Sequence, residues 1–139
     1  MALNANDLTT GQTHKATLVE DLKRTQIVQY AGASGDYNPL HTDEVFTTQV
    51  AGYPSVFAHG MLTMGMTGKM LTDYVGDGRL TKFGVRFTNQ VWPGDNLEAS
   101  ATLENIEEVD GNQLGNFEVI TTNQDGNVVL KGYAQARLD

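Results

Sequence analysis

The sequence contains no cysteine, which excludes a disulfide framework and any thiolate metal site. That absence is compatible with a reducing compartment, and we expect a cytoplasmic protein. The polar start MALNANDLTTGQ lacks the basic and apolar regions of a secretion signal. With 139 residues, of which 40% are hydrophobic and 19% charged, the chain predicts one folded domain over residues 1–139.

Long apolar runs and an excess of positive charge are also missing. The longest apolar stretch, around FAHGMLTMGM, is too short and too rich in glycine to cross a bilayer. The net charge of −8 produces a field that repels nucleic acid. The basic residues that an anionic ligand would need are scattered and are more simply read as solvated surface charges: Lys69, Arg79, Lys82, Arg86 and Lys131. We therefore expect neither a membrane nor a nucleic-acid partner.

The first half of the chain predicts one strand and three helices. We expect a strand over 13–20, a helix capped by Thr25, and a short helix through Phe46. After a loop over 51–57, HGMLTMGMTGKMLTDYV reads as a helix starting near His59 or Gly60. It is apolar nearly all round, which is typical of a buried helix. Glycines in its interior, Gly65 and Gly68, predict close approach of a strand or another subunit.

The second half changes to a period of two. Three runs alternate apolar and polar residues over 83–91, 97–103 and 117–121, and a last strand is expected over 128–138. The segments WPGDN, DGN and QDGN read as tight turns, so consecutive hairpins would make the sheet antiparallel. A sheet with one apolar helix predicts an α+β hot-dog fold, with the sheet wrapped around the helix. Its exposed edge strand predicts a dimer.

The segment GDYNPLH, residues 35–41, brings an acid and a histidine to the two sides of a proline break. Pro39 disfavours helical angles at Asn38, which becomes a natural N-cap with Pro39 in the first helical position. His41 then lies in the first turn of a new helix, while Asp36 precedes the break. The two side chains can converge and exchange protons near neutral pH. The helix start lowers and Asp36 raises the pKa of the imidazole, so the sequence alone does not decide its direction.

Other interpretations of these residues remain open. Asp, Asn and Pro are ordinary turn residues, and the histidine could act as a helix cap. A metal site formed by Asp36, His41 and Asp43 is a weak alternative, because no second histidine lies at ligand spacing. Gly60, in AHGML, starts the long helix, where free N–H groups could stabilise a carbonyl oxygen that gains negative charge. It could equally serve a tight junction between loop and helix.

GDYNPLH followed about twenty residues later by AHGML resembles the MaoC-like, (R)-specific enoyl-thioester hydratase family, and the later segments FGVRF and VWPGD extend the similarity over nearly the whole chain. AHGMLTMG is also similar to the catalytic B subunits of mycobacterial (3R)-hydroxyacyl-acyl carrier protein dehydratases. The resemblance implies a hot-dog fold, Asp36 and His41 as the acid–base pair, Gly60 as the oxyanion N–H, and Thr67 near the substrate. It implies reversible hydration of trans-2-enoyl thioesters to (R)-3-hydroxyacyl thioesters without cofactor or metal.

Three rival functions remain. A hot-dog thioesterase would often place a carboxylate on the central helix, and residues 61–72 contain none. A non-catalytic hot-dog partner or a plain acyl-binding module would need no acid–base pair. The sequence leaves open the acyl chain length, the direction of the reaction, coenzyme A or acyl carrier protein as the thiol, and a homodimer or a heterodimer with a related subunit.

Overall fold

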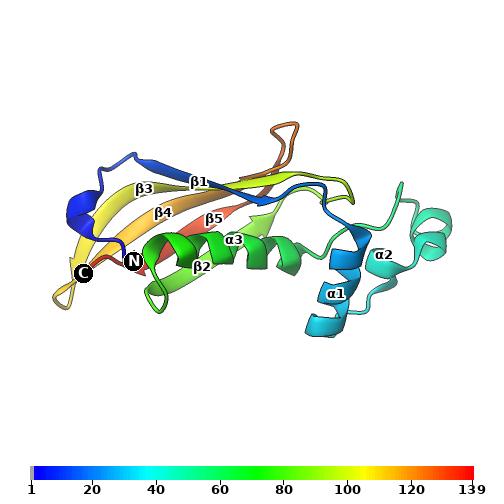
Figure 1. Ribbon diagram of the computed structural model, residues 1–139, viewed down its shortest axis with the longest axis horizontal. Helices are drawn as coiled ribbons and strands as arrows, with labels where there is room; N and C mark the ends of the chain where they lie inside the picture. Colours follow the sequence, from blue (N-terminus) through cyan, green and yellow to red (C-terminus); the bar gives the residue numbers. More distant parts are fainter. Residues whose placement is uncertain (1) are drawn as a thin grey trace.

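A five-stranded antiparallel sheet curves around one long helix in the computed structural model, which describes residues 2–139 (Figure 1). The spatial order of the strands is β1-β3-β4-β5-β2. They are β1 (Thr13–Val19), β2 (Leu80–Phe87), β3 (Leu97–Val109), β4 (Asn112–Thr122) and β5 (Val128–Arg137). The long helix α3 (Gly60–Val75) lies in the hollow of the sheet, which confirms the predicted hot-dog architecture.

The alternating pattern of the second half forms the centre of this sheet. On β3, Leu97, Ala99, Ala101 and Leu103 are buried, as the period of two predicts. Positive φ angles at Asp110 (52°) and Gly111 (82°) form the tight turn between β3 and β4. The hairpin predicted at DGN is therefore confirmed.

The predicted run of consecutive hairpins is wrong at β2. This strand pairs with β5 at one edge of the sheet, while β3 pairs with β1 near the other edge. The segment between β2 and β3 crosses from one edge of the sheet toward the other, and hydrogen bonds to Asp95 hold it in place. The Asp95 side chain accepts hydrogen bonds from Trp92 N and Gln124 Nε2, and its carbonyl accepts one from Leu22 N. Val91 is buried in this segment and does not continue the strand.

Helix α3 buries one face and not its whole circumference. Leu62, Met70, Leu71 and Val75 pack in the core. A stripe at four-residue spacing faces outward in the chain: Met61, Gly65, Lys69 and Asp73. The predicted buried central helix is therefore confirmed, but one of its faces stays exposed in the chain because a single sheet covers only one side. Of the two interior glycines, Gly68 has a close neighbour, since a Cβ there would lie 3.3 Å from the Phe83 ring, and Gly65 has none within 4 Å.

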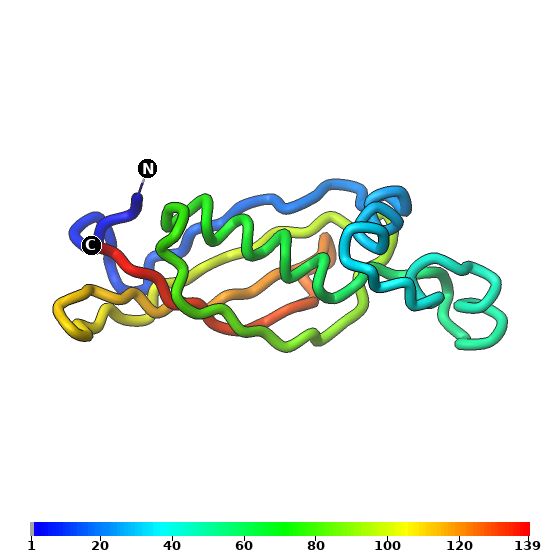
Figure 2. Tube along the Cα trace, turned by 90° about the horizontal axis from the view of Figure 1, so that it is seen from below, coloured from blue at the N-terminus to red at the C-terminus, as the bar shows by residue number. Residues whose placement is uncertain are grey.

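The helices between β1 and α3 project beyond the end of the sheet, beside the N-terminal end of α3 (Figure 2). They are α1 (Arg24–Ser34), α2 (Pro39–Thr42) and the π-helical turn η2 (Phe46–Val50); a short 3₁₀ turn, η1 (Ala5–Asp7), precedes β1. Lys23 and not Thr25 is the N-cap of α1, and its side chain makes no cap hydrogen bond. The predicted single helix through Phe46 is divided at Asp43, whose extended backbone ends α2 and whose carboxylate accepts from Phe46 N. No helix within residues 2–139 has the length and hydrophobicity needed to span a bilayer.

Candidate active site

A chain of short-range hydrogen bonds shapes the GDYNPLH turn. Gly35 adopts a left-handed conformation (φ 76°) and ends α1, with its N–H donating to Ala31 O. Asp36 Oδ1 accepts from Asn38 N, and Asn38 Oδ1 accepts from Leu40 N. Asn38 is thus the N-cap of α2 and Pro39 its first residue, as predicted. These bonds hold one Asp36 oxygen in the turn and leave the other free.

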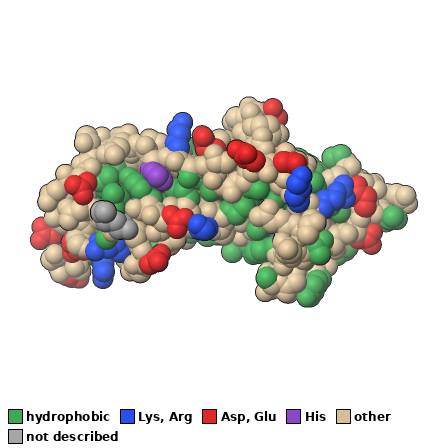
Figure 3. All heavy atoms as spheres, viewed as in Figure 1, with side chains coloured by type: hydrophobic (Ala, Val, Ile, Leu, Met, Phe, Trp, Pro, Cys, Tyr) green, Lys and Arg blue, Asp and Glu red, His purple; other side chains and the backbone are tan. Residues whose placement is uncertain are grey.

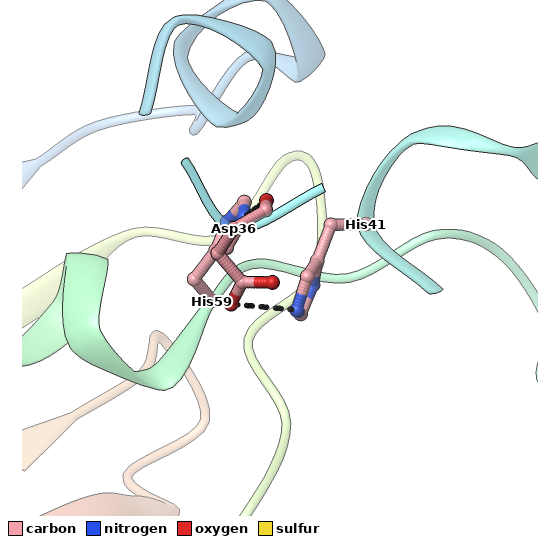
Figure 4. A group of neighbouring side chains, drawn as sticks. All are labelled: Asp36, His41 and His59. Carbon is pink, nitrogen blue, oxygen red and sulfur yellow. Dashed lines mark hydrogen bonds and ion pairs between the residues drawn. The ribbon is translucent and has the colours of Figure 1, made fainter. Parts of the chain in front are cut away.

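The free oxygen of Asp36 faces the imidazole of His41 (Figure 4). Asp36 Oδ2 lies 4.0 Å from His41 Nε2. This separation is longer than a hydrogen bond, so both atoms can bond one water or substrate oxygen placed between them. The predicted convergence of these two side chains is present in the structure. The carboxylate is half exposed and the imidazole is nearly buried, which gives the pair one side open to a ligand.

His41 is held in the tautomer that presents a basic nitrogen to Asp36. Its Nδ1 lies 2.7 Å from Phe57 O, and because a carbonyl only accepts, Nδ1 carries the proton and donates. Nε2 then has a lone pair directed toward the carboxylate. Burial lowers the pKa of His41, aided by the neighbouring His59 and opposed by the Phe57 carbonyl and Asp36. The sequence left the direction of this pKa shift open, and the surroundings of His41 in the structure favour its neutral form.

His59, the N-cap of α3, is a third member of the cluster that sequence reasoning missed. Its Nε2–H donates to the backbone oxygen of Asp36 (3.0 Å), and its ring stacks on His41 with centroids 3.8 Å apart. Tyr30 also packs edge-on against the His59 ring, with centroids 4.9 Å apart. His59 therefore joins the Asp36 turn to the start of α3. The available signal was its place directly before Gly60, in a chain with only three histidines.

The cluster is better suited to proton transfer than to metal binding. One potential ligand atom from each of Asp36, His41 and His59 lies within 4.8 Å of the others. However, the two imidazole rings are stacked at 24°, so their in-plane lone pairs do not converge on one ion. His59 Nε2 is also engaged with the Asp36 carbonyl. Asp43, the third ligand in the sequence-based alternative, has its carboxylate bonded to the start of η2.

A pocket of about 270 Å³ opens beside the first turn of α3. Gly60 and Thr63 line it together with apolar side chains and with the polar segment after β2; the other lining residues are Phe57, Ala58, Phe87, Thr88, Asn89, Gln90, Val91 and Val129. Phe57 joins the pocket to the cluster, because its carbonyl holds His41. As the first residue of α3, Gly60 has an N–H without an intrahelical partner. A Cβ at Gly60 would lie 3.1 Å from the Phe87 ring, so a larger residue here would require that ring to shift.

Thr67 lies about two turns beyond Gly60 on α3, in the core and outside this pocket. Its Oγ1 donates to Thr63 O (2.9 Å) and shares a hydrogen bond of 2.8 Å with Thr121 Oγ1 on β4. Both threonine side chains are fully buried. The structure thus brings Asp36, His41 and Gly60 to one end of α3 and places Thr67 in a hydrogen-bonded link between helix and sheet.

The hydrogen bond between Thr67 and Thr121 predicts that a single substitution destabilises the protein more than the double substitution does. Thr67→Val should lower the free energy of unfolding by about 1–3 kcal/mol, because the Thr121 hydroxyl would stay buried without a partner. In the double variant Thr67→Val/Thr121→Val much of this loss should return, since both polar partners are gone. Urea denaturation of the wild type and the three variants measures the coupling. Strictly additive effects would contradict the link.

Comparison with known proteins places this site within a described family. The family model described as "MaoC like domain" matches residues 5–125, which include the whole cluster. The 3-hydroxyacyl-thioester dehydratase Y of Mycobacterium tuberculosis is 45% identical over 67 residues, 46% of this chain and 23% of that protein. The enoyl-CoA hydratase ChsH3 of the same organism is 36% identical over 101 residues, 70% of this chain and 32% of that protein. This chain thus spans about a third or less of the length of these relatives.

The fold has a close counterpart among solved structures. The R-hydratase PhaJ1 from Pseudomonas aeruginosa superposes with a TM-score of 0.83 at 25% sequence identity, covering 97% of this chain and 84% of that one. The sheet, the long helix and the helices beside its N-terminal end therefore form an arrangement that a hydratase also has. Since the family model covers most of the chain and the candidate site lies inside it, the chain belongs to the MaoC-like domain family.

Proposed function

We propose that the protein catalyses the reversible hydration of trans-2-enoyl thioesters to (R)-3-hydroxyacyl thioesters. The observation that carries this proposal is the approach of Asp36 Oδ2 to His41 Nε2 at 4.0 Å, a separation that one water can bridge, near the pocket at the N-terminal end of α3. An acid–base pair beside free backbone N–H groups is what chemistry next to a carbonyl requires. The hydratase and dehydratase names of the relatives support the same class of reaction.

In the proposed reaction the pair holds a water beside Cβ of the enoyl group. One member takes a proton from the water as its oxygen bonds to Cβ, and a proton is delivered from the pair to Cα. The pair therefore carries the same number of protons before and after the cycle. The neutral His41, with its Nε2 lone pair facing Asp36, is already in the form that accepts a proton.

Charge that develops on the thioester oxygen needs a donor, and Gly60 is placed to supply one. Its N–H belongs to the first turn of α3, where the helix dipole favours negative charge. Loss of such a donor typically costs ~10²–10³ in rate. The apolar wall of the pocket, formed in part by Phe57, Phe87 and Val129, offers a surface for the acyl chain.

A thioesterase is the nearest rival, and α3 argues against it. Within this helix the only acidic residue is Asp73, which lies on the outward stripe and forms an ion pair with Lys69 (2.6 Å). A carboxylate so placed is far along the helix from Gly60 and does not line the pocket. Hydrolysis by a carboxylate on the central helix therefore has no candidate within residues 2–139.

The proposed function predicts a specific change when the protein is mixed with crotonyl-CoA. The absorbance of the conjugated enoyl thioester should fall without release of free thiol, and the product should be the (R)-3-hydroxy isomer. Release of thiol would favour hydrolysis. If neither signal changes, the non-catalytic readings remain: a hot-dog partner subunit or an acyl-binding module. A series of coenzyme A and acyl carrier protein thioesters of increasing length would then define the acyl chain and the carrier.

We also propose that the protein acts as a homodimer, with a heterodimer containing a related subunit as the alternative. The edge strands β1 and β2 each have one side unpaired in the chain. Hydrophobic side chains lie exposed over α3 and around α1 (Figure 3). The exposed large hydrophobic residues include Val28 on α1, Met61 on α3 and Phe87 at the end of β2. Apolar exposure next to an open sheet edge is typical of a surface that another subunit covers.

A further inference from the structure

The hydroxyl of Thr63 is a buried polar group for which the fold provides no partner. Thr63 is only 2% exposed, yet its Oγ1 makes no hydrogen bond within the described residues. A buried hydroxyl without a partner costs about 1–3 kcal/mol, and most such groups in native proteins are satisfied. An unsatisfied group that borders a pocket is therefore a candidate for contact with a ligand.

Other helical threonines show that Thr63 had a local partner available. Thr47, Thr48 and Thr67 each donate from Oγ1 to the carbonyl four residues earlier. The equivalent carbonyl for Thr63 is that of His59, which accepts from the backbone N–H groups of Leu62 and Thr63. The Thr63 hydroxyl makes no such bond, so its hydrogen-bonding capacity is free.

Thr63 lies on the pocket wall that carries Gly60, and its hydroxyl is buried just behind that wall. The two residues are three apart on α3 and so lie on the same face of the helix. Side chains on a helix tilt toward its N-terminus, which directs Thr63 over the first turn. Both residues line the same pocket, while Thr67, one turn further, is engaged with Thr121.

We propose that Thr63 Oγ1 donates a hydrogen bond to the thioester oxygen of the bound acyl substrate, as a second donor beside the Gly60 N–H. This inference rests on the proposed hydratase function. A bond to an oxygen that gains negative charge strengthens as the charge develops, so the hydroxyl acts mainly in the transition state. Thr63 is accordingly a catalytic residue that carries no proton of the reaction.

The test compares Thr63→Val and Thr63→Ser with the wild type in crotonyl-CoA hydration. Valine keeps the shape and removes the hydroxyl, and we expect kcat to fall about ten- to a hundredfold with KM little changed. Serine should restore most of the rate. Thermal unfolding of Thr63→Val should occur at the same or a higher temperature, because an unsatisfied buried hydroxyl has been removed. If Thr63 had only a structural role, Thr63→Val would lower the unfolding temperature, as Thr67→Val is expected to do.

Full activity of Thr63→Val would overturn the inference, as would equal loss of rate in Thr63→Val and Thr63→Ser. If the wild type does not hydrate crotonyl-CoA, the proposed function fails separately, and the dissociation constant of this thioester then decides the role of Thr63. A weaker complex with Thr63→Val and a normal one with Thr63→Ser would support the contact. Unchanged binding in both variants, or no binding by the wild type, would overturn it.

Discussion

Replacement of Asp36 by asparagine is expected to lower the rate of enoyl-thioester hydration by ~10²-fold or more. The amide keeps an oxygen that can accept from Asn38 N, so the turn before α2 should persist. It removes the negative charge and the proton-accepting oxygen that face His41 Nε2 at 4.0 Å. The expected loss is therefore in kcat, with a circular dichroism spectrum and unfolding temperature close to those of the wild type.

The matched control is Asp43→Asn, the same chemical change seven residues away. Asp43 caps the start of η2 through Phe46 N, and it does not belong to the cluster of Asp36, His41 and His59. Its activity should stay close to that of the wild type. A folded Asp36→Asn protein with full hydration rate, or an equal loss in Asp43→Asn, would refute the assignment of Asp36 to the acid–base pair.

The parts of the fold that were predicted correctly depend on neighbours in the sequence. Alternating residues such as Leu97 and Leu103 define which face of β3 is buried, and the DGN turn needs only Asp110 and Gly111 in left-handed conformations. The break at Pro39 and the cap at Asn38 are equally local. Each of these features depends on a few adjacent residues, so the local sequence pattern is sufficient to predict it.

The parts that were missed depend on contacts between distant segments. The edge position of β2 follows from its pairing with β5, about fifty residues later, and no turn signal reports that pairing. The outward stripe of α3 arises because one sheet covers one side, although Met61 on that stripe is apolar. Hydrophobic pattern alone cannot separate a helix buried all round from one whose exposed face is also apolar.

The candidate site shows the same division. The approach of Asp36 to His41 was predicted because Pro39 orders a short local segment. His59 was missed as a site residue because its role depends on a hydrogen bond to the Asp36 carbonyl, 23 residues away. The different surroundings of Thr63 and Thr67 likewise depend on β4, because Thr121 bonds Thr67 while Thr63, beside the pocket, has a hydroxyl without a partner. Contacts between segments far apart in the sequence cannot be read from the local spacing of residues.

Replacement of His41 by alanine is expected to lower hydration by ~10²-fold or more as well, because the basic Nε2 beside Asp36 is lost. The matched control is His14→Ala, which removes an imidazole that stacks on Tyr74 and lies outside the cluster. This control should keep its activity. Steady-state rates of both variants, with unfolding temperatures as the check on folding, measure the difference.

The acid side of the pH–rate profile should report the same imidazole. Burial lowers the pKa of His41 in the folded protein below its ordinary value near 6.5, so the active neutral form persists into mildly acidic solution. The hydration rate should fall only as the pH drops below the ordinary histidine pKa near 6.5. The residual rate of His41→Ala should lack this fall.

The unfolded chain binds the proton more readily than the folded protein, so the free energy of unfolding should rise with pH through the window below 6.5 and decrease as the pH falls. That slope should be smaller in His41→Ala, and an acid limb that stays in the variant would assign the titration to another group.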